Sequence, residues 1–159
     1  AKELFIPAGM TNTVMTDFYP VIPNRASGYF YNNGNWINAE PMISVRPSGG
    51  FLSTTSDMIK WDKVLREKNI ILTKENWELL WTPFIKTSTE AYAKSYYGFG
   101  WIVDEYNGHK IIGHGGSNTG FRTQYARFDD DRLSIIVLTN TDRVDPDKIV
   151  KKLADYLLK

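Results

Sequence analysis

The feature that most constrains the fold is a stretch between residues 97 and 138 in which apolar and polar residues alternate with a period of two. This period is typical of β-strands, because successive side chains of a strand point to opposite faces. Turn signals at Asn107-Gly108 and Asp129-Asp130-Asp131 divide the stretch. We therefore predict an antiparallel sheet of four strands, at residues 97–106, 109–114, 121–128 and 133–138. The last segment is almost continuously apolar, which predicts a central strand buried on both faces.

Three other stretches carry helix signals. Thr54 and Asp57 have the spacing of a capping box, and apolar residues then recur at helical intervals. A second helix is predicted to begin at Thr73 and to end near Pro83, with an apolar stripe formed by Trp77, Leu80, Trp81 and Phe84. A third begins at Asp145-Pro146, and its predicted buried stripe is Ile149, Val150, Leu153, Tyr156 and Leu157. An antiparallel sheet of about four strands, with this last helix on one face and two helices before it, is an α+β fold.

The first 52 residues show little periodicity. We expect the end of a helix within residues 1–12, a turn at Pro7-Ala8-Gly9 and a hairpin over residues 28–37 around Asn33-Gly34. Irregular stretches this long are typical of surface excursions that line a cleft. Tyr29 and Trp36 either line that cleft or anchor the segment. The predicted organisation is a single partial domain over 1–159, with an irregular part (1–52), a helical part (53–84) and a sheet with the C-terminal helix (96–159).

Composition excludes several classes of function. The 159 residues carry a formal net charge of +1 and no basic cluster, which argues against a nucleic-acid partner. Cysteine is absent, so thiol catalysis and disulfides are excluded. No apolar stretch is long enough to span a membrane. His109 and His114 are five residues apart on a predicted strand and point to opposite faces, so we expect no shared metal and no cofactor. The three aspartates at 129–131 are predicted to form a solvated turn rather than a cation site.

The densest group of functional residue types lies between Gly113 and Phe121. It holds one of two histidines and four of twelve glycines, between two strand-like segments. Glycine in or beside a strand indicates a sharp bend or a close approach to the backbone. Two interpretations are open. The stretch is either a substrate-facing edge that presents His114, Ser117 and unhindered amides, or a glycine-rich loop between two strands.

This stretch also resembles the third active-site motif of the serine β-lactamase and penicillin-binding-protein superfamily. That motif is usually Lys-Thr-Gly, and His-x-Gly commonly replaces it in the class C-like branch. Further segments resemble family motifs in the same order along the chain: Pro7-Ala8-Gly9-Met10-Thr11-Asn12-Thr13, Gly49-Gly50-Phe51-Leu52-Ser53-Thr54-Thr55-Ser56-Asp57-Met58, Tyr97-Gly98-Phe99-Gly100-Trp101 and Leu138-Thr139-Asn140. The resemblance covers nearly the whole sequence.

The resemblance implies roles for particular residues. His114 stands where the motif lysine usually lies, and the backbone N–H of Ser117 corresponds to one of two oxyanion donors. Gly115, Gly116 and Asn118 are implied as substrate-binding residues along a strand on which the substrate lies like an added strand. The implied partner is a small-molecule or peptide acyl substrate, and the implied location is periplasmic or extracellular. Tyr97 and Trp101, in contrast, are expected to pack beneath the strands.

One departure from the family pattern determines whether we expect this chain to be catalytically active. The family nucleophile lies in Ser-x-x-Lys, and no serine of this sequence has a lysine three residues later; Ser56 and Lys60 are one residue too far apart. Tyr31-Asn32-Asn33 has the spacing of the second motif, Tyr-x-Asn, but follows rather than precedes the segment at Pro7. We therefore expect the C-terminal portion of a serine hydrolase acting on a β-lactam, an ester or a D-amino-acid peptide, catalytically inactive as given.

The alternatives are a non-catalytic module that binds a peptide or a cell-wall fragment through the edge at residues 114–117, and a structural domain whose sheet edge pairs with a partner. We also expect that the missing N-terminal part leaves apolar surface exposed on the sheet and the early helices, which favours self-association.

Overall fold

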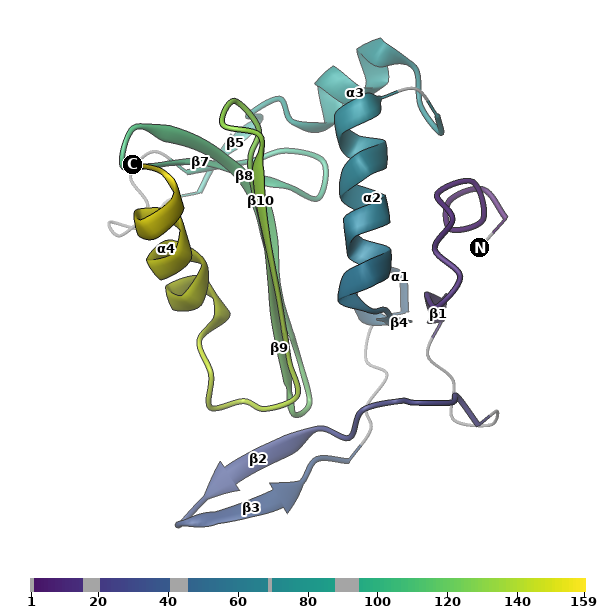
Figure 1. The fold of residues 1–159 in the computed structure, drawn as a ribbon, viewed down its shortest axis with the longest axis vertical. Helices are drawn as coiled ribbons and strands as arrows, with labels where there is room; N and C mark the ends of the chain where they lie inside the picture. The colour runs from purple at the N-terminus through teal and green to yellow at the C-terminus, as the bar shows by residue number, and fades with distance from the viewer. Residues whose placement is uncertain (1, 16–20, 41–45, 69, 88–94) are drawn as a thin grey trace.

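A computed structural model describes residues 2–15, 21–40, 46–68, 70–87 and 95–159. Parts of the predicted irregular segment, at 16–20 and 41–45, lie outside these ranges. Figure 1 shows a central antiparallel sheet with one long helix, α2 (Thr55–Glu67), on one face and the C-terminal helix, α4 (Pro146–Leu157), on the other. The fold is therefore α+β, as predicted. Among the described residues, no helix is both long enough and apolar enough to cross a bilayer.

The sheet has six strands, in the order β10-β9-β8-β7-β6-β5, and each neighbouring pair is antiparallel. Their bounds are Ile85–Lys86 (β5), Tyr96–Tyr97 (β6), Ile102–Tyr106 (β7), His109–Asn118 (β8), Phe121–Phe128 (β9) and Leu133–Thr139 (β10). The four-stranded meander β7–β10 confirms the predicted sheet. The two additional strands are short and form one edge.

Two strand predictions were wrong in detail. The segment at 97–106 is two strands rather than one, because the chain bends between Gly98 and Trp101, where Gly100 has a φ of +74°. The apolar strand β10 lies at the edge of the sheet rather than at its centre. Its apolar character still agrees with the predicted cover on both faces, because α2 and α4 both contact β10, one from each face of the sheet.

The helix starts agree with the cap signals. The Thr54 side chain accepts a hydrogen bond from the Asp57 N–H (3.2 Å), and α2 begins directly after it. Thr73 caps α3 (Lys74–Leu80), and Asp145 caps α4 by accepting from two backbone N–H groups. The helix α1 (Arg46–Gly49) is a single turn that ends at the first residue of the Gly49-Gly50 pair. Phe84, which was assigned to the stripe of α3, lies beyond that helix and is exposed.

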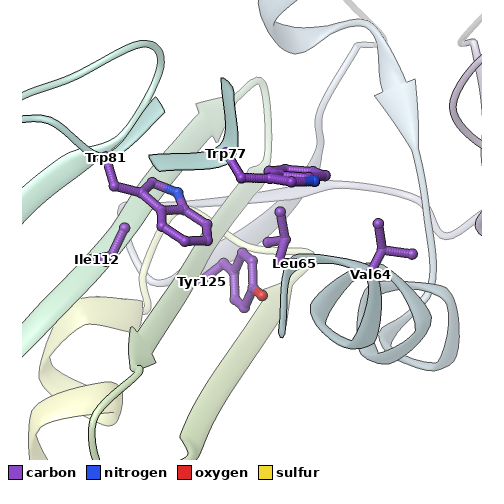
Figure 2. Packing of buried hydrophobic residues seen from close by; sticks show 6 residues of the cluster. All are labelled: Val64, Leu65, Trp77, Trp81, Ile112 and Tyr125. Atoms are coloured by element: carbon purple, nitrogen blue, oxygen red, sulfur yellow. The ribbon is translucent and has the colours of Figure 1, made fainter. Parts of the chain in front are cut away.

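The core is divided between the two faces of the sheet. On the α2 side, tryptophans of α3 pack with the buried face of α2 and with two strands, and Figure 2 shows Val64, Leu65, Trp77, Trp81, Ile112 and Tyr125. The α4 side is lined by Ala126, Phe128, Ile135, Val150 and Ala154. Because residues in register across β8 and β9 share a face, His114 lies on the same side of the sheet as Tyr125, which is the α2 side.

The predicted stripe of α4 was largely wrong. Val150 is buried, but Leu153 is 42% exposed and Tyr156 is 70% exposed. The face that packs on the sheet is formed by Pro146, Val150 and the small Ala154. The other apolar residues of the predicted stripe, Ile149 and Leu157, are exposed as well.

The N-terminal part forms two small antiparallel pairs. The predicted hairpin is present as β2 (Tyr29–Asn32) and β3 (Asn35–Asn38), and β1 (Val14–Met15) pairs with β4 (Phe51–Leu52). Tyr29 forms a bridge with Thr141, so the hairpin is tied to the segment that follows β10. Residues 2–12 form successive turns rather than the predicted end of a helix.

Candidate functional site

The glycine-rich stretch is the second half of a long strand, not a loop. Strand β8 continues to Asn118, where Thr119-Gly120 forms a tight turn into β9. The pairing of β7 with β8, however, ends at Gly113, opposite Ile102. Within the described part of the chain, residues 114–118 pair with β9 alone. This half of β8 therefore offers a free strand edge, and residues 114–117 are exposed.

The three glycines of this strand differ in how strictly the packing against β9 requires a residue without a side chain. A Cβ on Gly113 would overlap the carbonyl oxygen of Tyr125, so close packing against β9 explains that glycine without a ligand. A Cβ on Gly115 or Gly116 would meet side-chain oxygens, at 2.7 Å from Gln124 and 2.5 Å from Thr123. Side chains can rotate away more readily than a backbone can shift. Of the three glycines, only Gly113 is thus required by the backbone of the sheet itself.

Both ring nitrogens of His114 lie within hydrogen-bonding distance of protein groups. Its Nδ1 lies 2.6 Å from the carbonyl oxygen of Gly115, and its Nε2 lies 3.0 Å from the hydroxyl of Tyr97. The two rings pack edge to face, with centroids 5.8 Å apart. Tyr97 is therefore a site residue that the sequence interpretation assigned to packing. Trp101 does pack beneath the strands, against Trp81 and Tyr125.

The far end of the strand is fixed by Asn118. Its Oδ1 accepts a hydrogen bond from the Thr119 N–H (2.8 Å), and its amide group reaches the carbonyl oxygen of Gly49 (3.5 Å). The first contact stabilises the turn into β9, and the second links the strand to α1. Ser117, the neighbouring residue, is exposed.

Lys60, the lysine nearest in sequence to the serine candidate Ser56, is bound elsewhere. Its Nζ lies 2.8 Å from the carbonyl oxygen of Gly9 and 2.8 Å from Asp57 Oδ1. Asp57 is buried and also accepts from the Asn12 N–H and the Thr13 hydroxyl. Burial opposes ionisation of Asp57, but these hydrogen bonds outweigh it and hold its pKa below the usual value. This cluster fastens the segment at Pro7 to α2.

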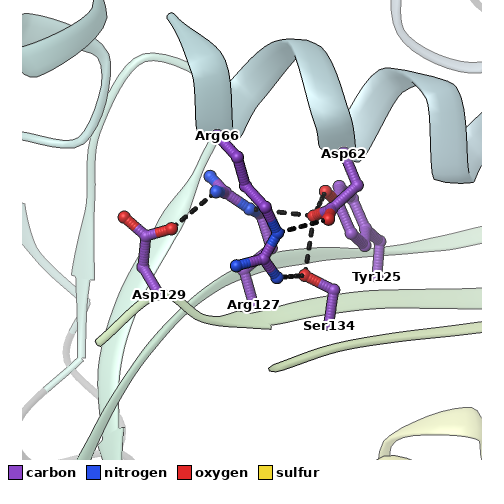
Figure 3. Close-up of polar contacts among 6 residues, drawn as sticks. All are labelled: Asp62, Arg66, Tyr125, Arg127, Asp129 and Ser134. Atoms are coloured by element: carbon purple, nitrogen blue, oxygen red, sulfur yellow. Dashed lines mark hydrogen bonds and ion pairs between the residues drawn. The ribbon is translucent and has the colours of Figure 1, made fainter. Parts of the chain in front are cut away.

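A second polar cluster joins α2 to the sheet, and Figure 3 shows its members. Asp62 Oδ1 accepts from the hydroxyls of Tyr125 (2.5 Å) and Ser134 (2.6 Å). Arg66 contacts Asp62 Oδ2 at 2.7 Å, and the buried Arg127 bridges Asp62 and Asp129. Burial raises the pKa of Tyr125, and the bond to Asp62 raises it further, so this tyrosine remains a donor. Tyr125 is the cross-strand neighbour of His114, so the cluster supports the strand that carries the site.

Within the described residues, no group of three or more His, Asp or Glu side chains is arranged to hold a metal ion. Two of the three aspartates of the 129–131 turn are engaged by protein groups. Asp129 pairs with Arg127, and Asp131 contacts the ring of His109 at 2.9 Å.

The comparisons with known proteins place the chain in a family. The Beta-lactamase family model matches residues 1–158, and the chain belongs to this family of serine β-lactamase and penicillin-binding-protein-like domains. Penicillin-binding protein 4* of Bacillus subtilis (strain 168) is 24% identical over 98% of the chain, and the D-aminopeptidase of Brucella ovis is 28% identical over 96%. The chain spans 37% and 29% of these two proteins, about a third of their length.

Solved structures agree with this placement. The octameric penicillin-binding protein homologue from Pyrococcus abyssi superposes with a TM-score of 0.86 at 27% identity, covering 99% of this chain and 36% of that one. The D-stereospecific amidohydrolase from Streptomyces sp. superposes with a TM-score of 0.76 at 18% identity, covering 99% and 47%. The fold is therefore that of a β-lactamase/transpeptidase-like domain.

Proposed function

We propose that this chain forms the substrate-binding side of the active site of a serine hydrolase that works through an acyl-enzyme. The observation that carries the proposal is the free edge of β8 at residues 114–118, beside the exposed and doubly held His114. An extended substrate adds to such an edge through backbone hydrogen bonds, while small residues permit its close approach. Membership of the family supports this use of the edge.

The proposed substrate is an acyl compound whose scissile bond is an amide or ester next to a D-amino acid. The D-aminopeptidase relative supports a D-amino-acid substrate, and the penicillin-binding-protein relative supports the same acyl-transfer class. A β-lactam is a cyclic amide and belongs to the same chemical group. We place the protein in the periplasm or outside the cell, where peptides that contain D-amino acids are assembled into the cell wall.

Each residue of the edge has a proposed role. The backbone N–H of Ser117 stabilises the oxyanion of the tetrahedral intermediate; loss of one such donor raises the barrier by about 3–4 kcal/mol in serine hydrolases. His114 presents its imidazole ring, fixed by Gly115 and Tyr97, beside the edge on which the substrate lies. Gly115 and Gly116 leave room for the substrate backbone. Asn118 contacts the substrate from the end of the strand, in addition to its bonds to the turn and α1.

The nucleophile is proposed to lie outside this 159-residue sequence, because no serine here has a lysine three residues later. An unassisted hydroxyl is a weak nucleophile at neutral pH. In the structure, the amine of Lys60 is bound to Gly9 and Asp57, which leaves Ser56 without help from that lysine.

The test is labelling with a fluorophosphonate, followed by the mass of the intact protein. The 159-residue chain is expected to show no adduct and no turnover of a D-alanine p-nitroanilide, a chromogenic cephalosporin or a p-nitrophenyl ester. With a segment carrying Ser-x-x-Lys supplied on the same polypeptide, one adduct and turnover are expected, and His114→Gln should lower that turnover. An adduct on Ser56 or Ser117 of the chain alone would contradict the proposal.

The absence of Ser-x-x-Lys favours one alternative, a non-catalytic module that binds peptide or cell-wall fragments along the same edge. Titration with a D-alanyl-D-alanine peptide distinguishes the two functions. The alternative predicts binding by the 159-residue chain alone, and no turnover when the nucleophile segment is restored.

We also propose that the protein self-associates. Several apolar side chains of α4 are exposed, and exposed apolar surface of this kind tends to be covered by association. A penicillin-binding protein homologue that shares the fold is octameric. Light scattering should detect a dimer or a larger assembly, and a monomer at high concentration would contradict the proposal.

A further inference from the structure

Tyr97 is the residue that the proposed function leaves without a role. Its hydroxyl lies 3.0 Å from Nε2 of His114, whereas the other ring nitrogen, Nδ1, lies 2.6 Å from the carbonyl oxygen of Gly115. A carbonyl oxygen only accepts hydrogen bonds, so Nδ1 must carry the hydrogen of that bond. In the neutral ring, Nε2 is then an acceptor, and the Tyr97 hydroxyl is its donor. This pair of contacts defines one tautomer and one ring orientation.

We propose that Tyr97 is a positioning residue for His114, which fixes the neutral imidazole in its Nδ1–H tautomer and holds the ring beside the free edge of β8. A hydroxyl both donates and accepts, so Tyr97 also keeps its bond to Nε2 when the ring is protonated. The ring orientation is therefore preserved in both protonation states, which a partner that only donates or only accepts does not achieve. The kinetic consequence of this inference rests on the proposed function, whereas the tautomer does not.

The backbone around Tyr97 is fixed from both sides. Tyr97 pairs with Ile85 on β5 and with Ile102 on β7, and its carbonyl accepts from the Phe84 N–H at 3.2 Å. The next residue, Gly98, is seated against α3: a Cβ there would lie 2.6 Å from the carbonyl oxygen of Leu80. These contacts fix the backbone that carries the Tyr97 ring, so its hydroxyl is pre-organised for the hydrogen bond to His114.

The direct test is the tautomer of His114, read from the ¹⁵N shifts of the imidazole nitrogens at a pH where the ring is neutral. The sequence has two histidines, and variants His114→Gln and His109→Gln assign their signals. The expected result for His114 is a protonated-type shift at Nδ1 and an unprotonated, hydrogen-bonded shift at Nε2. A protonated-type shift at Nε2 would overturn the proposal.

Tyr97→Phe removes the hydroxyl and keeps the ring, and Tyr96→Phe on the same strand is its matched control. Tyr97→Phe should move the Nε2 signal to the position of a nitrogen without a donor, while Tyr96→Phe leaves it in place. Both variants should retain the urea midpoint of the parent, which excludes a merely structural effect. An unchanged Nε2 signal in Tyr97→Phe would refute the role.

The kinetic arm uses the protein with its nucleophile segment and a D-alanine p-nitroanilide. Loss of one positioning hydrogen bond is expected to lower kcat about tenfold with little change in KM, the scale of a single hydrogen bond. If no turnover is seen in any variant but the tautomer is as stated, the proposed function fails and the positioning stands. If His114→Gln lowers turnover and Tyr97→Phe does not, the positioning role fails alone.

Discussion

Asp62 gives the sharpest test of how α2 is attached to the sheet. Its side chain is 13% exposed and accepts hydrogen bonds from Tyr125, Ser134, Arg66 and Arg127. Asp62→Ala removes the common acceptor of all four. The fully buried Arg127 keeps only Asp129 as an ionic partner, and its Nη1 already has no hydrogen-bond partner among the described residues.

The expected loss follows from these contacts. Removing one partner of a buried ion pair typically costs about 3–5 kcal/mol, because the remaining charge stays buried. The two hydroxyl donors add to the loss, but contributions within one network are not additive, so we expect about 4 kcal/mol in total. With a urea dependence of about 2 kcal/mol per molar, the midpoint should fall by about 2 M.

The same contacts predict a dependence on pH. Burial opposes ionisation of Asp62, but the bonds from Ser134, Tyr125 and Arg66 outweigh burial and lower its pKa below the ordinary value. A lowered pKa in the folded state contributes stability above the unfolded-state value of about 3.9, and this stability is lost as the pH falls through the folded-state pKa. The stability difference between the parent and Asp62→Asn should therefore be full at neutral pH and shrink below about pH 4.

The assay is urea unfolding followed by far-UV circular dichroism, at pH 7 and at several pH values down to 3. Asp130→Asn is the matched control, because Asp130 is an exposed aspartate of the 129–131 turn. The control is expected to change the free energy of unfolding by less than about 0.5 kcal/mol. If Asp62→Ala loses no more stability than this control, the network does not hold α2 to the sheet and the reasoning is wrong.

Five further variants test the packing and one helix cap by the same urea assay. Gly98→Ala places a Cβ against the carbonyl of Leu80 and should cost about 1–3 kcal/mol, whereas Gly49→Ala enters open space and should be nearly neutral. Asp145→Ala removes the cap of α4 and should cost about 1 kcal/mol; an unchanged midpoint would show that the cap contributes nothing. Val150→Ala should cost about 2 kcal/mol and the exposed Leu153→Ala less than about 0.5, so equal losses would contradict the assigned faces of α4.

The elements that the sequence predicted well are those whose signals are local. Asn107-Gly108 specifies a two-residue hairpin turn, and both residues have positive φ in the structure. Thr54 and Asp145 are helix caps whose hydrogen bonds are made within three residues. Such features depend on few neighbours, so the tertiary structure has little opportunity to override them.

The buried face of α4 could not be predicted, because apolar residues occur on more than one side of this helix. Burial is decided by the sheet, where Ala126, Phe128 and Ile135 pack with Val150 and Ala154 of the helix. Ala154 is fully buried in this cluster, although alanine contributes little to an apolar pattern. Leu153 has the stronger apolar signal and lies on the exposed side. The sequence pattern reflects only the hydrophobicity of each residue, whereas burial against the sheet also depends on the size of the side chain.

The strand that carries His114 could be predicted from the sequence, but the residues that contact His114 could not. His114 could be singled out as a rare residue in a glycine-rich strand, but its contact with Tyr97 joins residues that are 17 positions apart on different strands. The period-two pattern at 97–106 predicted one unbroken strand, and Tyr97 was expected to pack beneath the strands. No local signal distinguishes a tyrosine that packs from one whose hydroxyl reaches a histidine.

The bend between Gly98 and Trp101 accounts for both unusual features of the site. Because the chain leaves the sheet at Gly98 and returns only at Ile102, β7 begins opposite Gly113 and leaves the edge of β8 free from His114 onward. The same bend positions Tyr97 on β6, from which its hydroxyl reaches His114. A straight strand over 97–106 would continue the pairing along β8 and cover the edge. The two glycines of Tyr97-Gly98-Phe99-Gly100-Trp101 thus open the edge and supply the partner of the histidine that lies beside it.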